Sequence, residues 1–415
     1  CKIDGEASHK LITDAVTILK NLTHRGGVGS EPDTGDGAGI LIQMPHEFMC
    51  KVCASDGIKL PDKGDYGVGM LFLSPDKDTR EQSLAKLKEI IAEEKPDIVV
   101  VGWPYFLQVF FQPALRKAIK SCNARLVIRE IPFQTPPYGK IREYFKANPM
   151  HDEGMRLLSK GTGFYLRQWV TTQIRKYCYA KAAGTLNYST AAYDILPSYG
   201  VKKEQIHVTY NSTDTDALLK EKESVLASPS ILPPCDRRLL HIGRLVKWKR
   251  VDLLIEAFRK VAADYPEAEL VIVGDGPELD RLKQQASDLQ LADRIRFIGA
   301  VYDPKMLGAY MNESSIYVLA GMGGLSINDA MTYGMPVLCA VCDSTERDLV
   351  MEGRNGYFFK DGDADSLAER IREMFESPER CREMGKESER IIREKINMET
   401  VSKRYLKAFQ EIISQ

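Results

Sequence analysis

The stretch that decides the fold begins with RLLHIGR (residues 238–244) and continues with AELVIVGDG (268–276), RIRFIGAV (294–301), SIYVLAG (315–321) and MPVLCAV (335–341). Near-continuous apolar runs of this kind are typical of parallel strands that are buried on both faces. We expect a helix of about ten to fifteen residues after each run. The alternation predicts a doubly wound parallel sheet of about 190 residues.

The alternation also extends toward the amino terminus, in a weaker form. The runs there are KPDIVVVGW (95–103), RLVIREIPF (125–133), Gly184 to Tyr188 and QIHVTYNS (205–212), and we expect helices of about ten residues or more between them. A Pro-containing link, SPSILPPCDRR (228–238), separates the two regions, and an amphipathic helix is predicted over about Glu399 to Ser414. The fold class is therefore α/β.

Length and charge exclude some functions but select none. The chain has 415 residues, 44% of them hydrophobic, with 57 Lys and Arg against 58 Asp and Glu, a net charge of −1. This length leaves room for two or three domains. The balanced charge argues against a general nucleic-acid binder, and no apolar run is long enough to predict a membrane span.

The cysteines indicate a reducing, cytoplasmic setting, because nine Cys, an odd number, are dispersed along the chain. Two C-x-x-C pairs, at 50/53 and 339/342, could form a zinc site, but the second lies in an apolar strand whose alternation separates its thiols. We therefore expect buried or half-buried thiols and no metal. The chain starts at Cys1, so we expect a processed or partial sequence, and the interrupted apolar stretch 11–22 predicts no signal peptide.

The carboxyl ends of the expected strands are where a ligand binds in an open parallel sheet. Glycines there let the backbone approach a phosphate, and cations add charge. Tight turns alone are the other interpretation of these glycines, but three such ends with a basic pair favour a diphosphate site. The candidates are Gly243, Arg244, Lys249, Gly274, Asp275, Gly276, Gly321, Gly323, Gly324 and Leu325.

These motifs resemble the donor half of a family 4 glycosyltransferase of the two-domain GT-B fold. The match runs through HIGRLVKWKRVDLLIEAF (241–258), ELVIVGDGPELDRLK (269–283), IRFIGAV (295–301), GLSINDAMTYGMPVL (324–338) and EGRNGYFF (352–359). The resemblance implies that Arg244 and Lys249 grip the diphosphate of a UDP- or GDP-sugar. It also implies that Gly299, Ala300 and Val301 face the nucleotide base.

The family's E-x7-E motif, which holds the sugar and the ribose, is only partly matched. Asp329 stands at the second Glu and could still bind a ribose hydroxyl, whereas Gly321 stands at the first, so that sugar contact is missing. The backbone of Gly323, Gly324 and Leu325 could serve the phosphate or the sugar instead.

Residues 96–228 resemble the later part of the family's acceptor domain, with NSTDTD (211–216) at the hinge motif. The glycine-rich turn that opens that domain has no counterpart. At the position of the family's acceptor-side His, this chain has Glu130, Ile131 and Pro132 and no His. His151 is either a substitute for that His or an ordinary exposed loop residue. The resemblance implies a metal-independent, retaining transfer to a glycan or lipid-linked acceptor, without a cofactor. Asp214 and Asp216 spell D-x-D but lie in the hinge match, so we do not interpret them as Mg²⁺ ligands.

The first 95 residues resemble a different family, the amidotransferase domain of the glutamate synthase large subunit. HRGG (24–27), DTGDGAGILIQMPHEF (33–48) and GDYGVGMLFL (64–73) carry the match. That domain uses an N-terminal Cys as nucleophile, but the short spacing from Cys1 to Gly5 favours a later strand position for Cys1. Arg25 is then a loop-ordering remnant of this α+β fragment, and glutaminase activity is not expected.

Three domains follow: 1–95 amidotransferase-like, 96–228 an incomplete acceptor-side domain, and 229–415 the donor domain. Two partial resemblances thus meet near residue 95, through a natural fusion, a recombined chain or an artefactual joining. Beside the transferase, two alternatives stay open: a glutamine amidotransferase fragment, and a non-catalytic sugar-nucleotide module. RQWVTTQIRKYCYAKAA (167–183) is either a peripheral contact with the inner face of a membrane, through Arg167, Trp169, Arg175 and Lys176, or a helix with a buried apolar stripe, which we favour.

Overall fold

The computed structural model describes residues 95–102, 112–130, 135–151, 156–342 and 344–415. Every expectation for residues 1–94, including those for Cys1 and Arg25, lies outside the described residues. The chain divides into two compact units, residues 1–129 with 411–415, and residues 130–410, and each unit is described by itself.

Each unit contains a pair of parallel strands. In the first unit β1 (Ile98–Gly102) pairs in parallel with β2 (Arg125–Glu130), and α5 (Pro113–Ser121) packs Leu115 and Ile119 against the apolar side chains of these strands. In the second unit β3 (Gly184–Asn187) pairs in parallel with β4 (Ile206–Val208). All four strands that the sequence predicts here are confirmed.

Helices join these strands, and several are shorter than expected. The described elements are α5, α6 (Ile141–Ala147), α7 (Gly161–Tyr179), α8 (Ala192–Ile195), η3 (Leu196–Tyr199), η4 (Lys203–Gln205) and α9 (Thr215–Leu226). Because α5 has nine residues, α6 seven and α8 four, the expectation of ten or more residues between these strands holds for α7 but not for the other three helices; α9, with twelve residues, follows β4. Asp214 caps α9 by accepting from the Ala217 N–H at 3.1 Å, which is the role of an N-cap residue.

The second sheet has six parallel strands in the order β10-β9-β8-β5-β6-β7. Its strands are β5 (Arg238–Ile242), β6 (Glu269–Val273), β7 (Ile295–Gly299), β8 (Ile316–Leu319), β9 (Val337–Cys339) and β10 (Gly356–Phe358). The predicted doubly wound sheet is thereby confirmed, with β10 as an additional edge strand. The strand order reverses between β5 and β8, and a ligand crevice lies outside the carboxyl ends of the strands at such a reversal.

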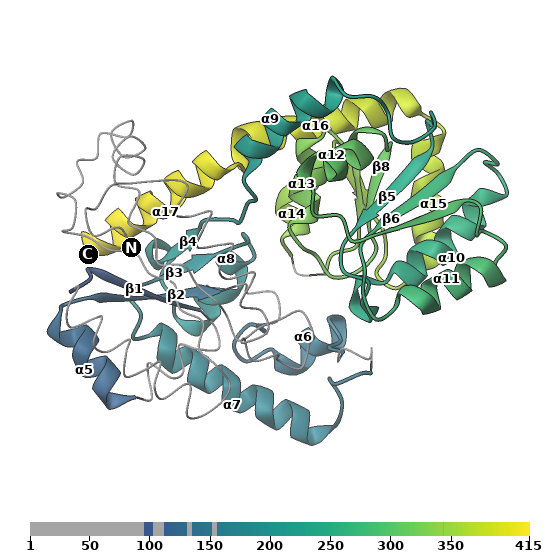
Figure 1. Cartoon of the computed structure of the whole chain (residues 1–415). Helices are drawn as coiled ribbons and strands as arrows, with labels where there is room; N and C mark the ends of the chain where they lie inside the picture. Colours follow the sequence, from purple (N-terminus) through teal and green to yellow (C-terminus); the bar gives the residue numbers. More distant parts are fainter. Residues whose placement is uncertain (1–94, 103–111, 131–134, 152–155, 343) are drawn as a thin grey trace, which may run out of the picture. The chain divides into compact units, whose positions relative to one another are not determined.

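Helices cover both faces of this sheet (Figure 1). One face carries α10 (Val251–Ala262), α11 (Leu279–Asp288) and α15 (Ala364–Phe375), whose apolar residues share a core with Leu239 and Ile272. The other carries α12 (Pro304–Asn312), α13 (Ser326–Thr332) and α16 (Pro378–Lys395), around Leu240 and Val271. Helix α9 packs on α12 and α13 although it precedes residue 229. The short α14 (Glu346–Leu349) and η5 (Lys247–Lys249) belong to the same domain, and α17 (Met398–Ile413) is the last helix of the chain.

The predicted length of about ten to fifteen residues is wrong for three of the helices that follow the strands of this sheet. Helix α12 has nine residues, α13 seven and α14 four. The early end of α13 has a local cause, because Gly334 adopts a left-handed φ of 76° and Pro336 follows two residues later. Glycine in that conformation and proline just beyond it both terminate a helix.

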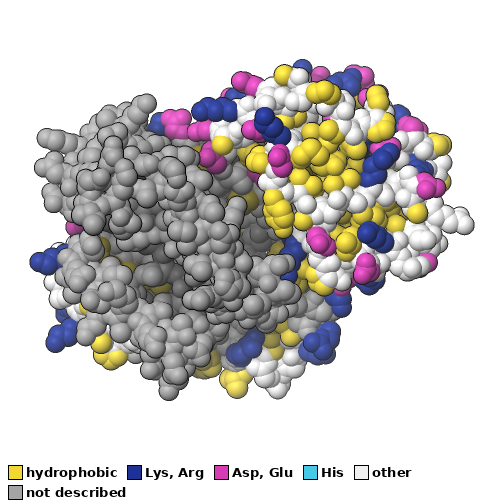
Figure 2. All heavy atoms as spheres, in the orientation of Figure 1, with side chains coloured by type: hydrophobic (Ala, Val, Ile, Leu, Met, Phe, Trp, Pro, Cys, Tyr) yellow, Lys and Arg dark blue, Asp and Glu magenta, His cyan; other side chains and the backbone are white. Residues whose placement is uncertain are grey.

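In the 339/342 pair Cys339 is buried and Cys342 is half-buried, as the sequence predicts. Burial raises the pKa of the Cys339 thiol well above its usual value. Among the residues that the structure describes, no group of three or more His, Cys, Asp or Glu is placed to hold a metal ion, and no helix is long and apolar enough to cross a membrane. Lys, Arg, Asp and Glu are interspersed over the described face of the donor domain that Figure 2 shows.

Candidate donor site

The loops after β5 and β8 meet at the reversal of strand order, and Lys249 joins them. Its Nζ donates to the carbonyl oxygens of Met322 at 2.9 Å and of Gly323 at 2.6 Å. A side chain on Gly324 would begin 3.1 Å from the same Nζ. Two predicted motifs that are more than 70 residues apart in the chain are therefore brought together, and the ammonium neutralises two carbonyl dipoles that would otherwise repel a phosphate.

Arg244 lies in the turn that leaves β5. It is exposed, while Leu245 behind it is fully buried and anchors the turn in the core. Lys249 ends η5, and the left-handed Arg250, with a φ of 53°, starts α10. The pair thus stands on backbone that is held by the core and by the start of a long helix, which is a rigid support for two cations.

Gly321 has a structural reason for having no side chain. A Cβ at this position would lie 2.2 Å from the Trp248 carbonyl oxygen and 2.6 Å from the Lys249 carbonyl carbon. The Met322 N–H donates to the same Trp248 oxygen at 2.9 Å. Because the backbone of η5 occupies the space, no acid could stand here in this arrangement of the loops.

We expect Gly321→Ala to destabilise the chain and to weaken nucleotide binding together. The methyl group must displace η5, which carries Lys249, and overpacking of this kind costs about 1–3 kcal/mol or more. Thermal unfolding with and without UDP measures both effects. Gly163→Ala is the matched control, since a Cβ there meets nothing within 4 Å; a Gly321→Ala chain that unfolds and binds UDP like the control would contradict this account of the loop contact.

Gly274 and Gly276, both predicted as donor-binding residues, also stand at close backbone contacts. A Cβ on Gly274 would lie 1.9 Å from the Gly243 carbonyl oxygen, and one on Gly276 2.5 Å from the Leu245 carbonyl oxygen. Their φ angles of 145° and 156° lie in the range that favours glycine. The backbones of the loops after β5 and β6 therefore lie in direct contact, and the Leu245 N–H donates to the Asp275 carbonyl oxygen at 2.8 Å. Asp275 is exposed, and its carboxylate accepts from the Gly276 N–H.

The segment predicted to face the base continues this edge of the sheet. Gly299 has a left-handed φ of 85°, and its carbonyl oxygen accepts from the Gly274 N–H at 2.8 Å. Ala300 is exposed and Val301 is half-buried. The next residue, Tyr302, which the sequence analysis did not single out, is 91% exposed. The segment thus adjoins the diphosphate loops through β6 and Gly274.

Asp329 lies on α13 with one carboxylate oxygen, Oδ1, buried and without a hydrogen-bond partner. Burial raises the pKa of this carboxyl, and the nearby Thr213 hydroxyl opposes the shift. A buried acceptor without a donor costs stability, and a ligand hydroxyl could supply that donor. Helix α13 itself has only seven residues, so its dipole is a weaker source of phosphate binding than the sequence led us to expect.

We expect Asp329→Asn to be at least as stable as the original chain at pH 7 and to bind UDP more weakly. The raised pKa means that ionised Asp329 lowers the free energy of unfolding above its folded pKa; this penalty fades as the pH falls toward the ordinary value of 3.8. Asn removes the charge and thus the penalty, but it weakens a hydrogen bond to a ribose hydroxyl. Thermal unfolding between pH 4 and 7 tests the sign: a variant that is less stable at pH 7 would contradict it.

The acceptor-side candidates lie in less favourable places. Glu130 is 4% exposed and forms an ion pair with Arg175, which is 6% exposed. Thr135 Oγ1 accepts from Arg175 at 2.6 Å, and the Tyr179 hydroxyl donates to the other Glu130 oxygen. A carboxylate that is buried and fully bonded is poorly placed to contact an acceptor. His151 is exposed and forms an isolated antiparallel bridge with Leu157.

The sequence analysis favoured a buried apolar stripe on this helix, but the structure does not show one on α7. Its buried residues are Thr172, Arg175, Cys178 and Tyr179, while Leu166, Trp169 and Val170 are 63%, 54% and 43% exposed. The interpretation of a helix with a buried apolar stripe is therefore wrong for this half of α7. Arg175 must also be removed from the predicted membrane contacts, because Glu130 binds it inside the domain.

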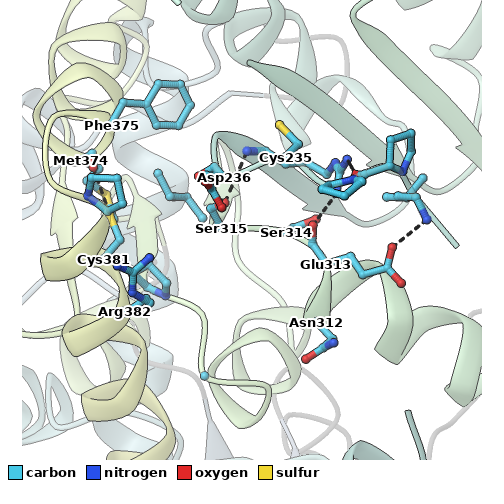
Figure 3. Close-up of a pocket in the computed structure, with 18 of the residues that line it drawn as sticks. Cys235, Asp236, Asn312, Glu313, Ser314, Ser315, Met374, Phe375, Cys381 and Arg382 are labelled. Atoms are coloured by element: carbon cyan, nitrogen blue, oxygen red, sulfur yellow. Dashed lines mark hydrogen bonds between the residues drawn. The ribbon is translucent and has the colours of Figure 1, made fainter. Parts of the chain in front are cut away.

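Two cavities lie near the second sheet. One of about 140 Å³ includes Gly324, Leu325 and Asn328 of the donor domain and Tyr188 and Tyr210 after β3 and β4. Another, of about 380 Å³, lies at the amino ends of β5, β8 and β9, where it is lined by Arg238, Ile316 and Pro336 (Figure 3). Because ligands in this type of sheet bind beyond the carboxyl ends of the strands, the second cavity is at the wrong end of the sheet for the donor.

Comparison with known families agrees with both resemblances. Residues 228–391 match the family model of glycosyl transferases group 1. This match takes in the second sheet and most of the helices that cover it. Residues 1–109 match the model of class-II glutamine amidotransferases and so extend past residue 95; the domain borders themselves stay predictions.

Individual relatives repeat this division of the chain. An uncharacterised glycosyltransferase of Methanocaldococcus jannaschii is 28% identical over 250 residues, which are 57% of this chain and 63% of that protein. The glutamate synthase [NADPH] large chain of Bacillus subtilis is 43% identical over 101 residues, 24% of this chain and 6% of that protein. The chain thus spans less than two thirds of the glycosyltransferase and a small fraction of the synthase.

Among solved structures, the crystal structure of Anabaena HepE in complex with UDP has a TM-score of 0.57 and 19% identity, over 81% of this chain and 85% of that one. HepE has also been solved with UDP-glucose. This likeness shows the fold, and the chain has the GT-B fold that the sequence predicts, with two parallel sheets.

Proposed function

We propose that the chain is a glycosyltransferase that moves a sugar from a nucleotide-diphosphate sugar to an acceptor glycan or a lipid-linked sugar. The observation that carries the proposal is the contact of Lys249 with the glycine-rich loop at the reversal of strand order, with the exposed Arg244 five residues earlier in the turn after β5. The UDP in the similar HepE structure supports a nucleotide donor.

The proposed chemistry follows from charge. As the glycosidic bond to the donor breaks, the sugar becomes oxocarbenium-like and negative charge grows on the departing nucleoside diphosphate. Arg244 can bind that diphosphate with two parallel hydrogen bonds, and Lys249 adds a second fixed charge. Preorganised cations at the point where charge develops lower the barrier most. Two such cations support a metal-independent transfer, and the family resemblance supports retention of the anomeric configuration.

The other predicted contacts keep their places in this proposal. Gly299, Ala300 and Val301 would face the base, and the Asp329 carboxylate would accept from a ribose hydroxyl. The backbone of Gly323, Gly324 and Leu325 would contact the sugar or the distal phosphate.

Turnover of the donor is the experiment that tests this function. The full chain is incubated with UDP- and GDP-sugars, with and without glycan and lipid-linked acceptors, and release of the nucleoside diphosphate is measured. We expect release with at least one sugar, accelerated by an acceptor. Binding without any release would favour the non-catalytic sugar-nucleotide module. If the chain shows no binding and no release with any of these sugars, the transferase proposal is refuted. Glutamate release from glutamine that is lost in Cys1→Ser would then support the amidotransferase fragment, which the match at residues 1–109 keeps open.

The exposed face of α7 supports a peripheral contact with a lipid acceptor or its membrane. Leu166, Trp169 and Val170 recur at helical spacing and are exposed, with Arg167 on the same helix. Lys140 and Arg142 line the adjoining cavity with Trp169, and Glu143 is the one acid that lines it among the described residues. Apolar side chains with surrounding cations are the combination that binds anionic lipid surfaces.

We expect Leu166→Ser with Trp169→Ser to reduce sedimentation with vesicles of phosphatidylcholine and phosphatidylglycerol by about tenfold, since two large apolar side chains leave the interface. Leu226→Ser on α9 is the control, because that leucine is 60% exposed and lies elsewhere. Equal binding of both variants and the original chain would exclude α7 as the lipid contact.

A further inference from the structure

His241 is a buried side chain at the donor crevice that neither the sequence analysis nor the proposed chemistry uses. It lies near the carboxyl end of β5, two residues before Gly243, and is 0% exposed. Its Nδ1 lies 3.0 Å from the Val318 carbonyl oxygen of β8. A carbonyl can only accept, so Nδ1 carries the proton, and Nε2 is left with a lone pair.

This lone pair has no hydrogen-bond partner although Nε2 is buried. A buried polar atom without a partner destabilises the folded state, and such costs tend to be found at functional sites. The pKa of His241 is lowered to about 4, chiefly by burial; the positive charge of Lys249 contributes to this shift and the bond to Val318 opposes it. The ring is therefore neutral at pH 7 and presents an acceptor.

The lone pair borders the same small space as the stem of Lys249. The position that a side chain on Gly243 would occupy lies 3.5 Å from His241 Nε2 and 3.9 Å from Lys249 Cε. Any residue larger than glycine at 243 would come between the imidazole and the lysine. The local sequence His-Ile-Gly-Arg thus leaves the imidazole acceptor open toward the cation that holds the glycine-rich loop.

We propose that His241 is a positioning residue of the donor site: its Nε2 lone pair, which makes no hydrogen bond in this structure, stabilises the nearby Lys249 ammonium electrostatically in the position that binds the donor diphosphate. The two ring nitrogens then have separate tasks. Nδ1–H ties β8 to β5 where the strands diverge, which is structural, and Nε2 acts on ligand binding through Lys249. This inference rests on the proposed nucleotide-sugar function.

Two conservative variants separate the two nitrogens. In His241→Asn the amide N–H replaces Nδ1–H toward Val318, but nothing replaces Nε2. In His241→Gln the longer side chain brings an acceptor to the Nε2 position and loses the contact with Val318. Affinity for UDP is measured by calorimetry and unfolding by heat, on the full chain, with GDP used if the original chain does not bind UDP.

We expect His241→Asn to unfold within about 2 °C of the original chain yet bind UDP about tenfold more weakly, the loss of one hydrogen-bonding group at a charged site. His241→Gln should unfold roughly 2–4 °C lower and bind UDP within about twofold of the original. A purely structural histidine gives the opposite order, with affinity following stability, and that order would overturn the proposal.

A second background tests whether the effect passes through Lys249. In a Lys249→Met chain, we expect His241→Asn to change UDP affinity by less than about twofold, since the group it orients is gone. An equal tenfold loss in both backgrounds would overturn the proposal. If the original chain binds neither UDP nor GDP, the proposed function fails first; if it binds and the variants bind equally well, only the role of His241 fails.

Discussion

Replacing Arg244 and Lys249 together by Met is expected to reduce affinity for UDP by about 100-fold or more and to abolish its effect on thermal unfolding. Each side chain supplies a hydrogen bond to a charged group, worth about 1.5–3 kcal/mol, and the two act on one diphosphate. The fall in affinity removes the stabilisation that a bound ligand confers by mass action. Calorimetry and a melting curve with UDP measure the two effects.

Arg259→Met with Lys283→Met is the matched control for this double variant. Both residues are exposed cations of the same domain, on α10 and α11 away from the strand ends, so the net charge changes equally. A comparable loss in the control would show that UDP responds to overall charge and not to the crevice.

Arg175→Met is expected to have the largest effect on stability. It leaves the Glu130 carboxylate buried with its main partner removed, and breaking a buried ion pair in this way costs about 3–5 kcal/mol. Denaturant unfolding, followed by circular dichroism, measures the loss.

The control for this prediction removes the other charge as well. Glu130→Met with Arg175→Met should recover most of the lost stability, because an apolar pair of similar volume has no charge to desolvate. If Arg175→Met alone is as stable as the original chain, the pair is not the buried contact described above. If Glu130→Gln abolishes turnover while stability is kept, Glu130 would return to the list of catalytic candidates.

Much of the donor domain could be predicted because its signals are local. The run Leu270–Val273, and Leu239–Ile242 with its one polar residue His241, are short and predict buried strands, and their alternation with helices favours a doubly wound sheet. The turn after β5, with Arg244 and Lys249, could likewise be located from the position of its strand end. The length of α13 was harder to predict, because its end depends on the combined effect of Gly334 and Pro336.

The remaining features depend on contacts between distant segments. Gly321 reads as a missing acid in the sequence, but the structure shows that the Trp248 backbone fills its side-chain space. Glu130 stands at a strand end like a catalytic residue, yet Arg175, 45 residues later, binds it inside the domain. His241 is one polar letter in an apolar strand, and only the geometry shows that its second nitrogen lacks a partner.

The most direct measurement of the central claim is a crystal structure of the full chain with UDP. The account predicts the diphosphate between Arg244, Lys249 and the loop from Gly323 to Leu325, at the carboxyl ends of β5 and β8. Density for UDP at the amino ends of the strands instead, in the cavity lined by Arg238 and Pro336 (Figure 3), or away from both cations, would contradict it.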